Sequence, residues 1–165
     1  MTFLVTVDDI PPEGLDLILD LSPEDLANLV SAQGQERPLA RSPLTGSLRL
    51  TRPDHRLAVR GNFEVKLSVT CDRCLNEFDF DLAGRVEEIL TLAPPGQTGN
   101  EDQDDQEGDG ALEIKGGQAD LSALVAEHFW LAWPFRFICR PDCAGLCPHC
   151  GTDLNQGPCN CSDKI

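Results

Sequence analysis

The sequence predicts an α+β fold, with an antiparallel β-sheet of about five or six strands, two helices and a C-terminal cysteine-rich knuckle. Apolar and polar residues alternate with a period of two from residue 44 onward, as in strands that bury one face. Two other segments carry apolar residues at helical spacing. After Ile138 the chain is mainly cysteine, glycine, proline and polar residues, too poor in apolar side chains to build a core. We therefore expect a β-rich domain at residues 1–137 and a cysteine-rich tail at residues 138–165.

The N-terminal part predicts one short strand and one helix. Residues 3–7 alternate loosely and favour the strand. Ser22 and Pro23 mark the start of the helix, because serine is a good N-cap and proline suits the first helical position. Gly34 fits a C-terminal stop, so the helix is expected at about residues 22–32.

The middle of the chain predicts antiparallel hairpins. Pro53-Asp54 is a turn signal between two alternating segments. Residues 63–70 alternate most regularly and run directly into Cys71, while alternation resumes at Phe78 beyond Cys74. Both cysteines are therefore expected at the bend between two antiparallel strands. Strands are expected at residues 44–51, 56–60, 63–70, 78–82 and 86–92.

A linker and a second helix follow. Residues 94–110 are rich in proline, glycine, glutamine, asparagine and acidic residues, which predicts a disordered acidic linker within the domain. Asp120 is the expected N-cap of a helix whose apolar spacing continues to Leu131, and Pro134 lies beyond its end. His128 lies on the apolar face of this helix and is expected to be a core or edge residue.

Charge is distributed unevenly along the 165 residues. The formal net charge of −15 disfavours broad binding to nucleic-acid phosphates or to an anionic membrane. Residues 37–60 differ, because they carry six arginines against one acidic residue, Asp54. This segment supplies the candidate RNA contacts, which are Arg49, Arg52, Arg56 and Arg60.

The sequence favours a cytoplasmic protein that does not contact a membrane. It has no apolar run near the length of a membrane span. The first basic residue is Arg37, so the positive n-region of a signal peptide is missing. Stable disulfides are rare in a reducing compartment, and paired cysteines there favour metal ligation.

The cysteines predict one or two structural Zn²⁺ ions. The pair at Cys147 and Cys150 is the strongest signal, since two thiolates two residues apart can hold one tetrahedral ion from a single loop. Our preferred grouping joins this pair to Cys159 and Cys161, which makes the tail a zinc knuckle. The other group would then be Cys71 and Cys74 with Cys139 and Cys143. Spacing alone does not choose partners, so Cys139 or Cys143 could replace either C-terminal cysteine. The candidate metal ligands are Cys71, Cys74, Cys139, Cys143, Cys147, Cys150, Cys159 and Cys161.

Other interpretations of the cysteines carry less weight. The hairpin pair could simply be small buried residues, or disulfides could form if the compartment were oxidising. A thioredoxin-like pair would open a helix, whereas Cys71 follows a strand and precedes another. His149 lies inside the knuckle and is a weaker ligand candidate. The chain shows no catalytic constellation, so we expect neither an enzyme nor a small-molecule substrate.

Taken together, these segments resemble the YceD family, the large ribosomal RNA subunit accumulation proteins. The resemblance lies in the CDRCL run at residues 71–75, the acidic linker, the helix that ends in LAWP at 131–134, and the CRPDCAGLCPHCGTDLN run at 139–155 with its two following cysteines. These elements cover about residues 45–161, and the cysteine tail is the most specific of them.

The resemblance implies a cytoplasmic bacterial protein needed for the synthesis, processing or stability of 23S ribosomal RNA. The implied partners are large-subunit assembly components. Among them, the acidic composition favours a basic ribosomal protein over contact of the arginines with 23S RNA. Some family members lack the C-terminal cysteines, which favours a stabilising role for the tail. Two alternatives remain at this point: a zinc-stapled protein-binding module unrelated to ribosomes, and a zinc-dependent RNA-processing enzyme.

Overall fold

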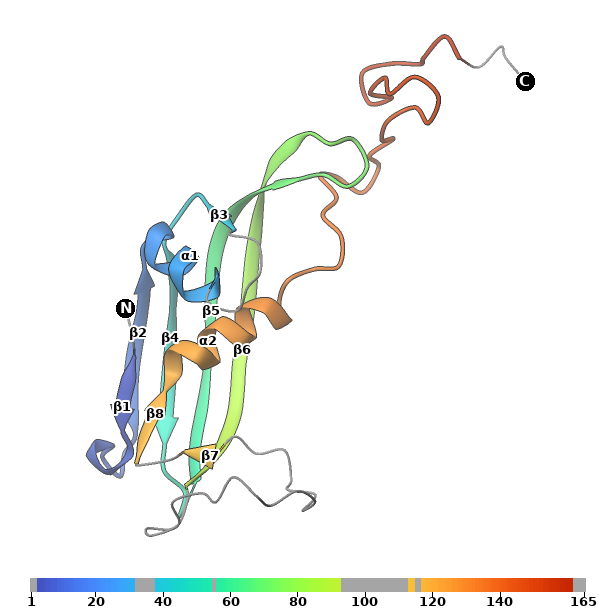
Figure 1. Ribbon diagram of the computed structural model, residues 1–165. Helices are drawn as coiled ribbons and strands as arrows, with labels where there is room; N and C mark the ends of the chain where they lie inside the picture. Colours follow the sequence, from blue (N-terminus) through green and yellow to red (C-terminus); the bar gives the residue numbers. More distant parts are fainter. Residues whose placement is uncertain (1–2, 32–37, 55, 93–112, 115–116, 162–165) are drawn as a thin grey trace, which may run out of the picture.

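The computed structural model describes residues 3–31, 38–54, 56–92, 113–114 and 117–161. Its main sheet has six strands in the order β2-β4-β5-β6-β7, with β3 paired to β5 (Figure 1). The expected α+β architecture with two helices is confirmed. The expected linker at 94–110 lies outside the described residues. The strands of this sheet are β2 (Leu15–Leu21), β3 (Leu39–Ala40), β4 (Leu44–Thr51), β5 (Arg56–Thr70), β6 (Glu77–Leu92) and β7 (Glu113–Ile114).

A long hairpin of β5 and β6 forms the centre of the sheet. The two strands pair without interruption from Arg56 opposite Thr91 to Thr70 opposite Glu77. The sequence predicted breaks near glycines 61 and 84, but both lie within continuous strands. At Gly84 the missing side chain makes room for an aromatic ring, since a Cβ there would overlap the ring of Phe63. Glycine marks a close approach here and not a strand end.

Four pairings were not predicted, and one of them is the short pairing of β3 with β5. β2 runs antiparallel to β4 with Leu15 opposite Leu50, and its sequence LDLILDL alternates as a half-buried strand should. β1 (Leu4–Thr6) and β8 (Gln118–Asp120) form a separate two-stranded sheet. β7 pairs in parallel with the end of β6, so the main sheet is antiparallel except at this edge.

Two helices lie in front of one face of the main sheet in Figure 1, and β1 leads into the 3-10 turn η1 (Val7–Asp9). α1 (Pro23–Ser31) starts as expected, with the backbone N–H of Asp25 donating to Ser22 Oγ. α2 (Leu121–Leu131) is capped by Asp120, whose carboxylate accepts from the N–H of Ser122. Neither helix is long and apolar enough to cross a membrane, within the described part of the chain.

The core lies between the helices and the sheet. Phe63 of β5 stacks on Phe129 of α2 with ring centroids 6.5 Å apart. His128 is buried as expected, with Nδ1 3.1 Å from the carbonyl oxygen of Leu124 and Nε2 3.5 Å from Glu88. Residues 134–161 contain no helix or strand, and only an isolated bridge joins Leu146 to Asp153. This tail extends beyond the far end of the β5–β6 hairpin (Figure 1).

Candidate metal centre

The loop between β5 and β6 presents the first pair of cysteines. It closes on itself, since Cys71 N–H donates to the carbonyl of Asn76 at 2.9 Å and Leu75 N–H donates to the carbonyl of Cys71 at 2.8 Å. Leu75 has a φ of 60°, in the left-handed region that residues other than glycine seldom adopt. This tight turn places Cys71 and Cys74 in one buried cluster.

The tail docks on this loop through hydrogen bonds from both backbone and side chains. Asp72 and Phe137 exchange two of them: Asp72 N–H donates to the Phe137 carbonyl at 2.8 Å, and Phe137 N–H donates to the Asp72 carboxylate at 2.7 Å. Arg73 does the same on the other side, donating from its guanidinium to the Cys143 carbonyl at 2.8 Å and accepting from Leu146 N–H at 3.0 Å. The tail segment that contains Cys139 is therefore held against the hairpin tip.

This docking brings four thiols into a first group. The Sγ atoms of Cys71 and Cys143 are 3.9 Å apart, and those of Cys74 and Cys139 are 3.8 Å apart. All four lie within 4.8 Å of one another. Four thiolates about 2.3 Å from a tetrahedral zinc ion would lie about 3.8 Å apart, whereas a disulfide is about 2.05 Å long. Three of the four residues are buried, and Phe78, Ile138 and Leu146 pack around them.

The second group lies in the tail alone. A knuckle turn forms because Gly151 N–H donates to the Cys147 carbonyl at 2.9 Å and Cys147 N–H donates to the Thr152 carbonyl at 2.8 Å. Gly151 has a φ of 73°, which suits glycine. The Sγ atoms of Cys147 and Cys159 are 3.3 Å apart, and all four Sγ atoms, with those of Cys150 and Cys161, lie within 4.8 Å of one another. This group is more exposed than the first.

Asn155, which lies between Cys150 and Cys159 in the chain, contacts the tail segment around Cys143 of the first group. Its side-chain oxygen accepts from Ala144 N–H and from Arg140, both at 2.8 Å, and its amide nitrogen lies 3.5 Å from Cys143 Sγ. Asp153 adds a bond to the hairpin loop, accepting from the side chain of Asn76 at 3.0 Å. Sequence reasoning missed both residues, although each stands in the tail motif between the cysteine pairs.

Each group combines one thiol of lowered pKa with two thiols of raised pKa, Cys74 and Cys139 in the first and Cys159 and Cys161 in the second. Burial raises the pKa of Cys71, but backbone N–H groups from Cys139 and its own loop outweigh burial and lower the pKa to about 6. The hydroxyl and backbone N–H of Thr152 lower the pKa of Cys150 to about 6. Burial and then the neighbouring thiols raise the pKa of Cys139 to about 12, and Cys150, followed by burial, raises that of Cys161 to about 12. Four thiolates can therefore gather in either group only around a cation.

The observed grouping is the one that the sequence analysis preferred. The hairpin cysteines lie with Cys139 and Cys143, and the other four cysteines lie together in the knuckle. Neither Cys139 nor Cys143 replaces a C-terminal cysteine in the second group. His149 is exposed and belongs to neither group. Both clusters could hold a metal ion, and the role of the eight cysteines as ligands stays a prediction.

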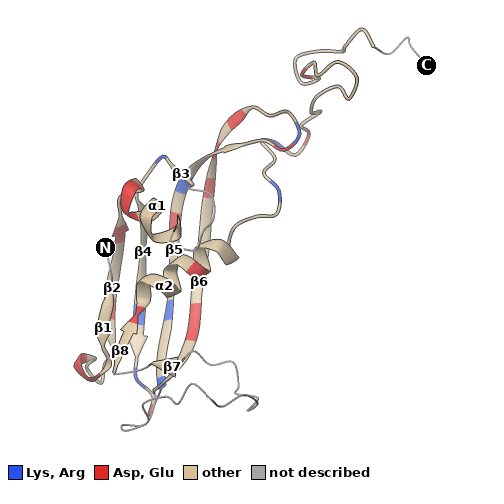
Figure 2. Ribbon diagram, in the orientation of Figure 1, with Lys and Arg blue, Asp and Glu red and all other residues tan. Residues whose placement is uncertain are grey.

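Three of the four arginines predicted to contact RNA take part in ion pairs with this chain. Arg49 pairs with Asp16, Arg52 with Asp8 at 2.7 Å, and Arg60 with Glu87 at 3.3 Å. Asp16, Arg49, Arg60 and Glu87 form one row across four strands, because each is in register with the next. Arg56 lies opposite Thr91 at the open end of the β5–β6 hairpin, away from its cysteine loop. The arginines thus belong to a mixed-charge face (Figure 2), and their contact with RNA stays a prediction.

The fold and the cysteine groups define a class: a small α+β protein whose sheet carries a cysteine-rich tail with two candidate four-thiol metal sites. The chain belongs to the YceD family. The family model, described as "Large ribosomal RNA subunit accumulation protein YceD", matches residues 59–165, which include the hairpin, α2 and both cysteine groups.

Mycobacterial proteins are among the relatives. The uncharacterised protein Rv2926c of Mycobacterium tuberculosis is 31% identical over 114 residues, covering 67% of this chain and 51% of its own length. The uncharacterised protein ML1660 of Mycobacterium leprae is 26% identical over 124 residues, covering 75% of this chain and 55% of its own. The chain thus spans about half the length of these curated relatives. No solved structure matches it.

Proposed function

We propose that this protein is a non-enzymatic accessory factor for 23S ribosomal RNA synthesis, processing or stability, and so for accumulation of the large ribosomal subunit. The observation that carries the proposal is the match to the family named for large ribosomal RNA subunit accumulation, which spans residues 59–165. The match includes the hairpin loop and the tail that docks on it. We place the protein in the cytoplasm, where large subunits are assembled.

Zinc is the proposed metal in both cysteine groups. Soft thiolates in a tetrahedral arrangement suit zinc. The two Sγ–Sγ distances given for the first group, 3.9 and 3.8 Å, match the edge of such a tetrahedron. A catalytic zinc keeps one position open for water, whereas four cysteines fill every position. We therefore assign both ions a structural role, which disfavours the zinc-dependent RNA-processing enzyme.

Protein purified without added metal should contain about two equivalents of zinc, because each closed site holds one ion with four ligands. Elemental analysis by inductively coupled plasma mass spectrometry measures this directly. Cys71→Ser and Cys150→Ser should each lower the content by about one equivalent. A single equivalent in the unmodified protein would remove one of the sites, and iron with visible absorbance would replace zinc by an iron–sulfur cluster.

Charge suggests a basic protein as one partner. The chain carries a net charge of −15, and acidic residues recur along β6 (Figure 2). Glu77, Asp79 and Asp81 alternate on its exposed face. Ribosomal proteins are rich in cations, so charge complementarity would speed and direct their encounter with this surface. Such binding should weaken with salt, because attraction between exposed charges is screened within about 10 Å at 0.1 M ionic strength.

Deleting the gene should lower 23S RNA relative to 16S RNA and deplete mature large subunits. Sucrose-gradient profiles and quantification of both RNAs measure this, and re-expression of the intact protein should restore the ratio. An unchanged 23S to 16S ratio would refute the ribosomal role. The chain would then be better explained as a zinc-stapled protein-binding module outside the ribosome.

A further inference from the structure

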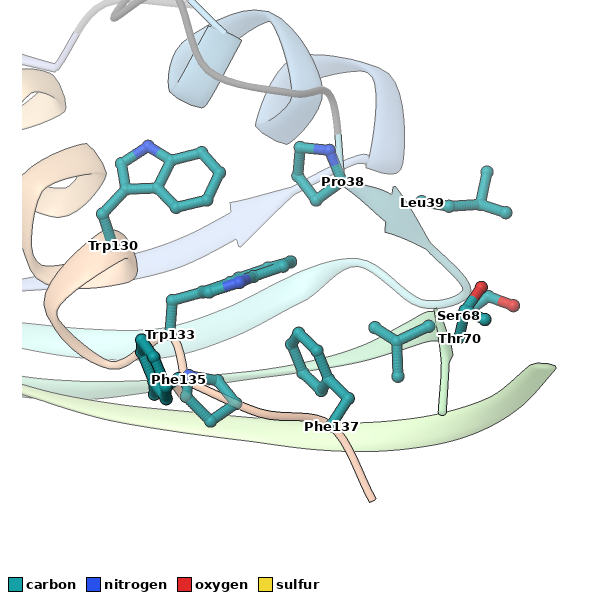
Figure 3. Close-up of a pocket in the computed structure, with 10 residues that line it drawn as sticks. Pro38, Leu39, Ser68, Thr70, Trp130, Trp133, Phe135 and Phe137 are labelled. Atoms are coloured by element: carbon teal, nitrogen blue, oxygen red, sulfur yellow. The ribbon is translucent and has the colours of Figure 1, made fainter. Parts of the chain in front are cut away.

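An aromatic groove lies where α2, β3, the end of β5 and the start of the tail meet. Its volume is about 790 Å³. In Figure 3, Pro38 and Leu39 lie on one side of the groove and the aromatic rings of Trp133 and Phe137 on the other. Ser68 and Thr70 add two hydroxyl groups at one end. None of the described lining residues is charged. Both tryptophans of the chain belong to this lining: the lining residues are Pro38, Leu39, Ser68, Val69, Thr70, Trp130, Trp133, Pro134, Phe135 and Phe137.

Most of the groove rings are fixed by one another. Trp133 lies 5.1 Å from Trp130 and 5.0 Å from Phe137 between ring centroids, and Phe137 lies 5.1 Å from Phe80. Phe135 is the exception, because its side chain is 95% exposed. The Arg136 guanidinium lies 5.9 Å from the centroid of the Phe135 ring. The Phe135 ring is therefore a large apolar surface open to water.

The segments that build the groove carry more cations than carboxylates, but the neighbouring strand β6 places Asp79 and Glu77 directly opposite Ser68 and Thr70. Residues 38–42, 66–74 and 130–140 carry five cations, Arg41, Lys66, Arg73, Arg136 and Arg140, against the single carboxylate of Asp72. Three of these cations pair with acidic residues outside the segments, namely Asp79, Asp81 and Asp142. Arg136 makes no ion pair with any described residue. Arg41 reaches the lining itself, donating to Ser68 Oγ at 3.0 Å.

We propose that this groove binds a single-stranded RNA segment, with bases stacked on the aromatic rings and a phosphate near Arg136. Sequence-tolerant RNA sites combine exposed aromatic faces with guanidinium groups in this way, and hydroxyl side chains can bond to ribose or base edges. An apolar anchor of a protein partner would also fill the groove, but the Arg136 guanidinium beside the Phe135 ring has no ion partner among the described residues and favours an anion there. The proposal rests on the proposed function and adds an RNA contact separate from the predicted one of the ion-paired arginines on β4 and β5.

Intrinsic fluorescence tests the proposal, because both tryptophans line the groove and the chain has no tyrosine. A short single-stranded RNA of mixed sequence, titrated into the full chain, should quench the emission saturably, and the same sequence as a duplex should not. Phe135→Ala should weaken binding about ten-fold, the effect of losing one base–aromatic stack. The residue is exposed, so the variant should fold as the unmodified protein does.

Arg136→Ala should also weaken binding and flatten the salt dependence by about 0.7 in log–log slope, as for one lost phosphate contact on a single strand. Arg85→Ala is the matched control, since Arg85 is an exposed arginine on β6 outside the groove, and its affinity should not change. Equal RNA affinity in the unmodified protein and both groove variants would overturn the proposal. So would a Phe135→Ala variant that loses large-subunit proteins in a pulldown yet keeps its RNA affinity, because the groove would then hold protein. Either failure leaves the 23S to 16S ratio in the deletion strain as a separate test of the proposed function.

Discussion

Replacing Cys71 by serine should release the whole tail from the hairpin, whereas replacing Cys150 should loosen only the knuckle. Cys71 is fully buried in the group that joins the two parts of the chain, while Cys150 is exposed and belongs to the tail alone. Binding of zinc to small structural sites contributes about 10–16 kcal/mol of apparent free energy. The hydrogen bonds that dock the tail contribute about 1 kcal/mol each, so they cannot replace the metal.

Limited proteolysis followed by mass spectrometry distinguishes the two variants. Cys71→Ser should open cleavage sites from about residue 134 onward, and Cys150→Ser only beyond about residue 147. Far-UV circular dichroism should remain that of the sheet in both, because the core between the helices and β2–β6 does not include the cysteines. A chelator should reproduce the effect of the two substitutions combined. If the tail of Cys71→Ser stays as protected as that of the unmodified protein, the metal is not what holds it.

Replacing Phe63 by alanine should destabilise the domain by about 3–5 kcal/mol, which is a large part of the 5–15 kcal/mol available to a domain of this size. Phe63 is 2% exposed, stacks on Phe129 and fills the space above Gly84. Its loss leaves a cavity between the sheet and α2. Urea unfolding measures the change, and Ile18→Ala is the control, since Ile18 is 82% exposed and should change stability by less than about 0.5 kcal/mol.

A substitution at Gly84 should be energetically coupled to a substitution at Phe63. Gly84→Ala puts a methyl group into the Phe63 ring and should cost about 1–3 kcal/mol. Combined with Phe63→Leu, which frees part of that space, the cost should be less than the sum of the two single changes. Additive costs would show that the ring moves away from the alanine without penalty.

Local signals in the sequence predicted the helices well. Ser22 and Asp120 are found at the two helix starts, because a side chain that caps a helix acts within a few residues. The sheet was harder to predict. Glycines 61 and 84 lie in the gaps between predicted strands. β5 and β6 continue through them because Gly61 lets β4 approach closely and Gly84 makes room for the Phe63 ring. β2 was missed because a leucine-rich alternation has no strong β-branched signal.

The candidate sites show the same limit. Adjacent cysteine pairs are visible in the sequence, but contacts over 72 residues, such as Cys71 with Cys143, depend on where the hairpin tip meets the tail. Side chains from three distant segments, residues 38–39, 68–70 and 130–137, form the aromatic groove, so no single sequence motif predicts it. The arginines drew attention through their density, whereas their ion partners on β2 and β6 lie elsewhere in the chain.

The separation between the two halves of the first cysteine group also orders events during translation. Cys74 leaves the ribosome 65 residues before Cys139, which at about 5–20 residues per second is a wait of about 3–13 s. During that interval the nascent hairpin offers only two thiols to a metal ion. β1 waits longer still for β8, its partner at residues 118–120. The first cysteine group can therefore close only after Cys143 has been synthesised, well after the hairpin that presents Cys71 and Cys74.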